Sequence, residues 1–412
     1  ISADGQPVLS DIAYLPFGPA TTWTDGSGLL HTETFDTDYR STGIAVGSLQ
    51  DFGYLYDAAD NITDWTDDLD TGNSQSFGYD ALDRLTDADG PYGAVDFTYD
   101  AVGNRRSKTV DTEITSYSYP ADSHRLQETT GADPGTYTYD AAGNLIQDDR
   151  FQYVYKQANR LAEVKQSGAT VATYTYNAEG QRVAKSAGAQ NRHYVYGTEG
   201  ELLGVYDAAT GDPIEEFVYF SSVPVATIRS GIPYYVHTDH LRTPRLVSDQ
   251  TQTVVWRWIS DPFGEAIPDQ DPDGDGTIFV LNLRFPGQYF DAETTRNYNY
   301  FRDYDPTLGR FVQSDPLGIG PAPSTYGYAN ANPIRYSDPQ GLWAGVDDVV
   351  TGPVDEIIVI GGLVIASYLG CQAATDALDA LISLYNENAS EQDSAQEDAD
   401  ARQREYEAVS YT

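Results

Sequence analysis

The sequence has little cysteine, no methionine and few basic residues, and two of these shortages exclude whole classes of protein. Its 412 residues contain a single cysteine, Cys371, which rules out a disulfide framework and any zinc site built from cysteines. Only 24 Lys and Arg residues stand against 63 Asp and Glu residues, which gives a net charge of −39. Because proteins bind nucleic acids through Lys and Arg contacts to phosphate, this balance predicts no nucleic-acid partner.

The start of the chain also lacks familiar features. It opens on Ile1 without a methionine, a basic segment or an apolar segment, so we interpret it as a fragment or a processed product. The chain is nevertheless 40% hydrophobic and 12% aromatic, which is too much for a disordered acidic protein. The excess of one charge keeps a protein soluble and suits a secreted, extracellular or cell-surface location.

What the first half does contain is a repeat. An aromatic–x–aromatic step, usually followed by Asp, recurs about every 20 residues. Because side chains alternate between the two faces of a strand, both rings of a step share one face. The Asp-x-x-Gly-Asn stretches at 100–104 and 140–144 and the similar stretch at 177–181 predict tight turns, in which Asp or Asn accepts backbone N–H groups and Gly takes a positive φ. Each repeat is therefore a predicted β-hairpin that buries its aromatic face only by stacking. The clearest copies lie at 54–57, 77–80, 97–100 and 137–140.

From residue 231 the repeat gives way to dense and distinctive motifs. They occupy the stretches 235–247, 256–265, 282–291, 297–306, 309–318 and 326–342. Together with the repeats at 35–220, these motifs resemble the Rhs family of YD-repeat proteins, which includes wall-associated proteins, toxin-complex C subunits and teneurins. The resemblance implies an all-β fold, in which a spiralling sheet of YD hairpins forms a shell or partial cocoon around an inward-curling Rhs core domain.

The resemblance also implies a division of the chain, which we identify as a C-terminal fragment of a family member. We expect a remnant of the shell at 1–34, YD repeats at 35–230, the Rhs repeat-associated core domain at 231–342, and a short, partly helical variable segment at 343–412. A wall of this length is short for a complete cocoon. We therefore expect either a partial shell or closure by self-association through open sheet edges, as a homo-oligomer or filament.

Two aspartates carry the expected chemistry. Asp315 and Asp338 both stand in Ser-Asp-Pro contexts. From the residues alone, Asp-Pro is a favourable start for a turn. Two carboxylates held close together, however, share a proton and can supply the base and the acid of peptide hydrolysis. In the resembling family an Asp-Pro-x-Gly-Leu element marks a self-cleavage point. This implies an aspartic-type protease that acts once on itself, between Leu342 and Trp343, with Arg310 as a neighbour that tunes the charge.

An acidic stretch predicts cation binding. Asp271, Asp273 and Asp275 match positions 1, 3 and 5 of a calcium loop, but position 12 is Asn282 rather than Glu. The alternative is an exposed acidic hairpin tip without metal. Calcium is thus the one cofactor that the sequence suggests, and none is required.

A second pattern, His237-x-Asp239-His240, also has the residue types of a metal site. On a strand, His237 and Asp239 would share a face while His240 points away, so three convergent ligands would need a turn. The alternative is a set of polar side chains satisfied in a buried corner.

The variable segment contains an uncharged run at 357–371. It is shorter than the ~20 residues that span a bilayer as a helix, which favours a buried helix or strand over membrane contact. We expect the segment to be the shell's internal cargo or plug. The preferred function is an extracellular shell that encloses this peptide and releases it by autoproteolysis, as in polymorphic toxin or contact-dependent competition systems. The alternative is a non-catalytic structural or adhesive surface protein, such as a self-assembling filament subunit.

Overall fold

The computed structural model describes residues 2–3, 6–16, 18–318 and 324–342, and two short strands at 357–360 and 363–366. The chain divides into two compact units, Ile1–Thr351 and Gly352–Thr412. In the second unit, β33 (Ile357–Ile360) and β34 (Leu363–Ala366) form an antiparallel hairpin. The helical part expected within 343–412 lies outside the described residues. In the described part of the chain, no helix is both long and apolar enough to cross a bilayer.

Two antiparallel sheets of 13 strands make up most of the first unit, and strand order in each follows the chain. The first sheet contains β3 (Leu9–Tyr14), β4 (Ala20–Asp25), β5 (Leu30–Phe35), β6 (Ser41–Val46), β7 (Gln50–Tyr56), β8 (Ile62–Asp67), β9 (Gln75–Tyr79), β10 (Leu85–Gly90), β11 (Gly93–Tyr99), β12 (Arg105–Val110), β13 (Glu113–Ser118), β14 (Glu128–Gly131) and β15 (Gly135–Thr136). The second contains β16 (Thr138–Tyr139), β17 (Leu145–Gln147), β18 (Gln152–Tyr155), β19 (Leu161–Gln166), β20 (Ala169–Tyr176), β21 (Arg182–Ala187), β22 (Gln190–Tyr196), β23 (Leu202–Asp207), β24 (Pro213–Phe220), β25 (Val223–Arg229), β26 (Ile232–Thr238), β27 (Pro244–Ser248) and β28 (Val254–Arg257).

Smaller elements complete the described chain. β1 (Ser2–Ala3) pairs with β2 (Gln6–Pro7). A four-stranded antiparallel sheet contains β29 (Tyr289–Asp291), β30 (Arg296–Asn299), β31 (Arg302–Asp305) and β32 (Arg310–Phe311). Three short 3₁₀ turns lie at Thr71–Asn73, Gln157–Asn159 and Ala329–Ala331.

The Asp of a YD repeat shapes its turn as the sequence predicts. Asp57 Oδ1 accepts hydrogen bonds from the backbone N–H groups of Ala59 and Asn61, and Asn61 Nδ2 donates to the second carboxylate oxygen. Asp100 binds the backbone and side chain of Asn104 in the same way. One carboxylate thus satisfies the turn and fixes the side chain four residues later.

The two aromatic residues of a repeat have different contacts. The first ring is buried, as at Phe77, which is 6% exposed. The second ring is only partly buried, and its hydroxyl donates to a carbonyl of an earlier strand. Tyr79 donates to Ile62 at 2.7 Å, and Tyr99 donates to Leu85 at 2.9 Å. The first ring therefore builds the core, while the second ties each hairpin to its neighbour.

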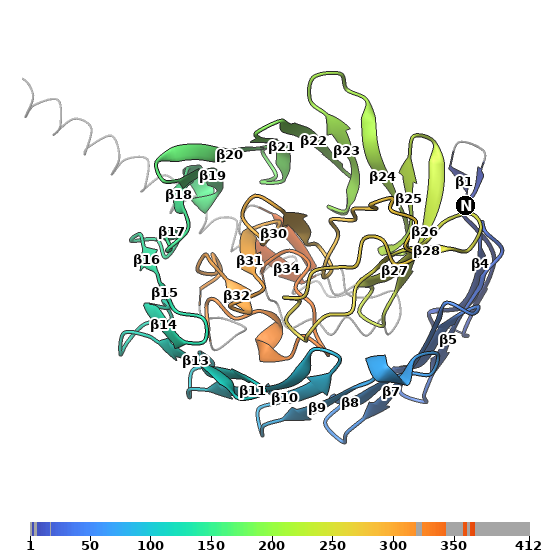
Figure 1. Ribbon diagram of the computed structural model, residues 1–412, viewed down its shortest axis with the longest axis horizontal. Helices are drawn as coiled ribbons and strands as arrows, with labels where there is room; N and C mark the ends of the chain where they lie inside the picture. The colour runs from blue at the N-terminus through green and yellow to red at the C-terminus, as the bar shows by residue number, and fades with distance from the viewer. Residues whose placement is uncertain are drawn as a thin grey trace, which may run out of the picture. The chain divides into compact units, whose positions relative to one another are not determined.

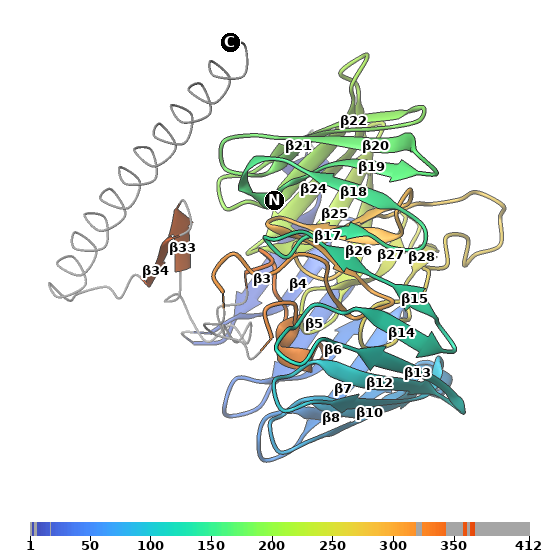
Figure 2. The ribbon, with the colours of Figure 1, turned by 90° about the vertical axis from the view of Figure 1, so that its left-hand side faces the viewer.

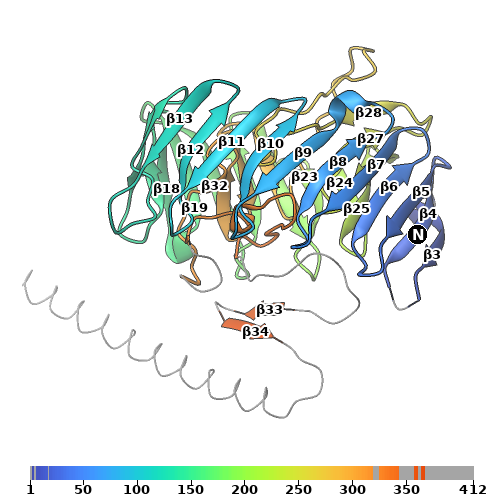
Figure 3. The ribbon, with the colours of Figure 1, turned by 90° about the horizontal axis from the view of Figure 1, so that it is seen from below.

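In the first unit, the wall closes on itself within one chain. The strands of both sheets follow one another around a ring (Figure 1), and the side view shows β13–β15 leading on to β17–β19 (Figure 2). Figure 3 shows the first sheet as an inclined row of adjacent strands. The ring closes at a seam where the first strands of the first sheet meet the second sheet. There, Gln252 Nε2 donates to the Ser27 carbonyl at 3.0 Å, and the rings of Tyr14 and Phe220 are 6.5 Å apart. Closure therefore needs no second copy, although the sequence predicted either a partial wall or closure by self-association. A homo-oligomer or filament stays a prediction.

The Rhs core segment curls into this ring, as expected for the family. β30, β31 and β32 lie inside the circle of wall strands (Figure 1). Tyr304 and Phe311 are fully buried there. They belong to one apolar cluster with the wall side chains Tyr194, Val205 and Trp256. The core segment and the wall thus share one hydrophobic core.

Candidate functional site

Asp315 and Asp338 each begin a turn, as the Asp-Pro pattern predicts. Asp315 Oδ1 accepts the Leu317 N–H at 2.8 Å. Asp338 Oδ1 accepts the Leu342 N–H at 2.8 Å, and the Asp338 carbonyl accepts the Gly341 N–H at 3.2 Å. The hydrogen bond from the Leu342 N–H to Asp338 spans four residues, as does the bond from the Asn61 N–H to Asp57 in a YD turn. It places one carboxylate directly against the residue that precedes the expected cut.

Arg302 brings the two aspartates together. Its Nη2 lies 3.0 Å from Asp315 Oδ2 and 3.1 Å from Asp338 Oδ2. The guanidinium stacks on Phe311, with Cζ 3.6 Å from the ring centroid, and its Nε donates to the Gly341 carbonyl. Because the arginine side chain is 1% exposed, its position is fixed by packing as well as by charge. The structure thus brings the predicted pair onto one guanidinium.

Burial dominates the electrostatics of the pair. It raises the pKa of Asp338 to about 6, against the opposing effects of Arg302 and the Leu342 N–H, and the negative charge of Asp315 adds to the rise. Burial also raises the pKa of Asp315, while Arg302 and the Leu317 N–H lower it. Asp338 is 3% exposed and Asp315 is 9% exposed. Asp338 is therefore the better placed of the two to keep a proton, up to about pH 6.

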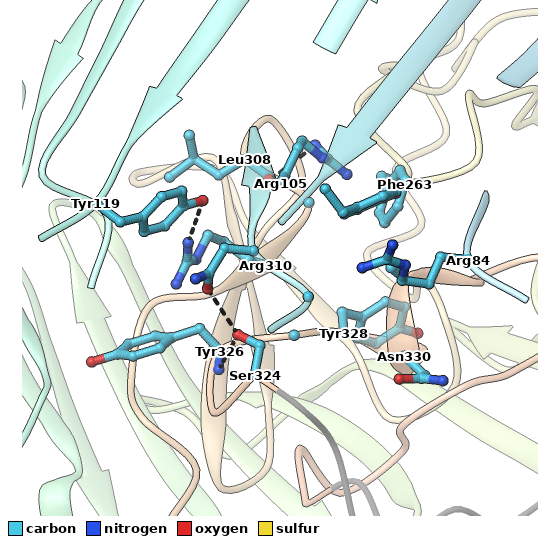
Figure 4. Close-up of a pocket in the computed structure, with 16 residues that line it drawn as sticks. Arg84, Arg105, Tyr119, Phe263, Leu308, Arg310, Ser324, Tyr326, Tyr328 and Asn330 are labelled. Carbon is cyan, nitrogen blue, oxygen red and sulfur yellow. Dashed lines mark hydrogen bonds between the residues drawn. The ribbon is translucent and has the colours of Figure 1, made fainter. Parts of the chain in front are cut away.

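Arg310, the expected neighbour of the pair, makes other contacts. Its Nη1 donates to the Tyr119 hydroxyl at 2.9 Å, and its guanidinium lies 4.8 Å from the ring centroid of Tyr326. Arg310 and Tyr119 line a small pocket with a volume of about 40 Å³. Figure 4 shows the two side chains next to each other in this pocket. The arginine that joins the carboxylates is instead Arg302, which sequence reasoning missed. The sequence did contain a signal for Arg302. It is a basic residue inside the aromatic-rich motif 297–306, and an arginine buried among aromatic side chains needs an acidic or polar partner.

The residues flanking the expected cut are described on one side only. Leu342 is 6% exposed, and its N–H is held by Asp338. Trp343 lies outside the described residues.

Gly287 supports the turn from the other side. It has a φ of +76°, and a Cβ built on it would lie 1.8 Å from the Pro339 carbonyl oxygen.

The predicted calcium ligands gather at one place. Asp271, Asp273 and Asp275 each offer a carboxylate oxygen within 4.8 Å of the other two. Asn282, at position 12, donates instead to the Tyr289 hydroxyl at 3.1 Å. Calcium binding stays a prediction based on these three aspartates.

The His237-x-Asp239-His240 pattern does not form one ligand set. Asp239 Oδ2 accepts from Arg245 Nε at 2.8 Å, while His240 Nε2 lies 2.7 Å from the Ile334 carbonyl oxygen. His237 contacts the neighbouring strand β27 instead, with Nε2 2.8 Å from Ser248 Oγ.

Comparison with known proteins agrees with the closed wall of hairpins. The Teneurin YD-shell family matches residues 39–322. The chain belongs to this family. Toxin protein Tse5 of Pseudomonas aeruginosa is 38% identical to this YD shell over 108 residues, which cover 26% of the chain and 8% of Tse5. Double-stranded DNA deaminase toxin A of Burkholderia cenocepacia is 27% identical over 318 residues, which cover 74% of the chain and 18% of that toxin.

A solved structure shows the same fold. In the Tc holotoxin pore of Photorhabdus luminescens, which contains TccC3, the match has a TM-score of 0.67 at 18% identity. It covers 82% of this YD shell and 19% of the matched chain. The chain therefore spans less than a fifth of the length of each of these relatives.

Proposed function

We propose that this YD shell cuts its own chain once, between Leu342 and Trp343, and so releases its variable C-terminal segment. The observation that carries the proposal is the contact of Asp315 and Asp338 with the same Arg302 nitrogen, next to the Leu342 N–H. Two of the relatives, Tse5 and double-stranded DNA deaminase toxin A, are toxins, which supports a role in a polymorphic toxin or competition system. A secreted or cell-surface location is part of the proposal, and the net charge of −39 supports it.

The two aspartates supply the base and the acid. Ionised Asp315 takes a proton from a water molecule, whose oxygen attacks the carbonyl carbon of Leu342. Protonated Asp338 gives its proton to the nitrogen of Trp343, and the C–N bond breaks. The products are a carboxyl group at Leu342 and an amino group at Trp343. The two aspartates end with their protonation states exchanged.

Arg302 sets up this division of roles. Two carboxylates buried together cannot both ionise without a cation, and one guanidinium compensates one negative charge. The remaining carboxyl group keeps its proton, and the more deeply buried Asp338 is the one favoured. Arg302 also donates to the carbonyls of Gly341 and Thr325, so it holds the two aspartate turns in one arrangement.

The intact mass of the denatured full chain tests the proposal. We expect the wild type to give two masses, with the break after Leu342, and Asp315→Asn and Asp338→Asn to give one unbroken chain. Asp303→Asn is the matched control, because Asp303 is also buried and has a raised pKa but accepts from Gln313 Nε2 at 2.6 Å. This control should be cut normally.

A single unbroken mass for the wild type would overturn the proposal. It would favour a non-catalytic structural or adhesive surface protein instead. A cut in Asp338→Asn at the wild-type rate would also overturn it, because the acid would then be another group.

A further inference from the structure

Three potential metal ligands meet at the seam where the ring closes. Asp25 ends β4, His31 lies on β5, and His237 lies on β26 of the other sheet. They are 4%, 5% and 0% exposed, respectively. One ligand atom from each residue lies within 4.8 Å of those of the other two. Two imidazoles and a carboxylate are the ligand types of a zinc site with an open fourth position.

Asp25 is held in a fixed orientation by its own turn. Its Oδ1 accepts from the Ser27 N–H at 2.9 Å, the Ser27 hydroxyl at 2.7 Å and the Leu29 N–H at 3.1 Å. Its other oxygen, Oδ2, lies 3.2 Å from His31 Nε2. Tetrahedral Zn²⁺ with bonds of about 2.0–2.1 Å separates its ligand atoms by about 3.3 Å. The spacing between these two atoms therefore suits a shared ion.

His237 supplies a second and independent observation. Its Nε2 lies 2.8 Å from Ser248 Oγ, but its Nδ1 is buried without a hydrogen-bond partner among the described residues. The imidazole rings of His237 and His31 have centroids 5.0 Å apart. A buried polar nitrogen without a partner is costly, and a hydrogen bond between Asp25 and His31 alone does not relieve that cost.

We propose that Asp25, His31 and His237 bind one Zn²⁺ ion. The ligand atoms are Asp25 Oδ2, His31 Nε2 and His237 Nδ1, with water in the fourth position. The Ser248 hydroxyl accepts the remaining N–H of His237, as hydrogen bonds from metal-bound imidazoles usually do. The ion joins β4 and β5 to β26 and so fastens the two ends of the wall. The site is independent of the proposed self-cleavage.

Titration of the chelator-treated full chain with Zn²⁺ alone tests the site. We expect calorimetry to show one ion per chain, and Co²⁺ in its place to give the visible absorption of a four-coordinate site. At a Zn²⁺ concentration 100-fold above Kd, the Tm should rise by about 4 °C for a unit of this size. Absence of stoichiometric Zn²⁺ binding by the unmutated chain would overturn the proposal without any variant.

Variants locate the ion. Asp25→Asn keeps an oxygen for the Ser27 and Leu29 N–H groups but removes the charged ligand, so Zn²⁺ affinity should fall at least about 100-fold and the Tm rise should vanish. His193→Gln, at an exposed histidine, and Asp273→Asn, in the acidic loop, should bind as the wild type does. Unchanged binding by a folded Asp25→Asn chain, or binding lost in Asp273→Asn, would overturn the assignment. If Asp25→Asn fails to fold, His31→Gln replaces it with the same expected loss.

Discussion

The proposed self-cleavage is expected to slow as pH rises through 6, because Asp338 must hold a proton to release the Trp343 amine. Burial raises the pKa of this carboxyl to about 6. Above that value, its protonated fraction falls about tenfold for each pH unit. Between pH 7 and pH 8 the rate constant should therefore fall about tenfold.

Refolding gives access to this rate. The full chain, denatured in guanidinium before it can cut, is diluted into buffers between pH 5 and 8. Samples are quenched in denaturant, and the fragment 343–412 is measured by gel and intact mass. Tryptophan fluorescence follows folding at each pH, so that slow folding is not mistaken for slow cleavage. A rate constant that changes less than threefold over this range, with folding complete, would refute the assignment of Asp338 as the acid.

The same carboxyl should make stability depend on pH. Folding raises the pKa of Asp338 from 3.8 to about 6, so the proton stabilises the folded state. This stabilisation is full below pH ~4 and is lost as pH rises through about 6, by about 3 kcal/mol in total. Because the wild type is expected to cut itself, urea unfolding between pH 4 and 7 is measured in the uncut Asp315→Asn chain, which should show the loss. When Asp338→Asn is added to that chain, this part of the pH dependence should disappear, and an identical profile in both variants would contradict the raised pKa.

Two further predictions use matched pairs of variants. Gly287→Ala should slow self-cleavage at least tenfold and lower the free energy of unfolding, because its Cβ would strike the Pro339 carbonyl and move the Asp338 turn. Gly231→Ala is the control, because Gly231 has the same φ of +76° but a Cβ built on it has no atom within 4 Å. Equal effects of the two variants in the refolding assay would show that the contact with Pro339 is not the cause. Tyr79→Phe should cost about 1 kcal/mol in urea unfolding, because it loses the hydroxyl bond between hairpins. Tyr155→Phe, whose buried hydroxyl has no partner among the described residues, should cost less, and the same loss in both would show that the bond contributes nothing.

The hairpins could be predicted from the sequence because their causes are local. The alternation of Phe77 and Tyr79 sets the face of the strand, and the carboxylate of Asp57 binds N–H groups only two and four residues away. These interactions need no knowledge of distant segments. The resemblance of the later motifs to the Rhs core domain predicted that this segment curls inward. The buried aromatic cluster that it shares with the wall confirms this prediction.

The partners of the candidate sites could not be predicted, because they come from distant segments. Arg302 reaches Asp315 and Asp338 only after β31 packs against the two aspartate turns. The spacing of His237 and Asp239 suggested a local ligand set, but the strand and its turn direct Asp239 to Arg245. His237 instead meets its neighbours across the seam, where closure of the ring decides the contact.

Closure of the ring also has a consequence for the proposed chemistry. Arg302 stacks on Phe311, and Phe311 shares one apolar cluster with the wall side chain Trp256. The guanidinium therefore reaches its position only when the core segment has packed inside the wall. In an unfolded chain, Asp315 and Asp338 have ordinary carboxyl pKa values and are both ionised at pH 6, where folded Asp338 still holds much of its proton, so in the unfolded chain neither can serve as the acid. A chain that has not closed its wall lacks both the arrangement and the proton that the cut requires, which makes the proposed cleavage a step that follows folding rather than one that competes with it.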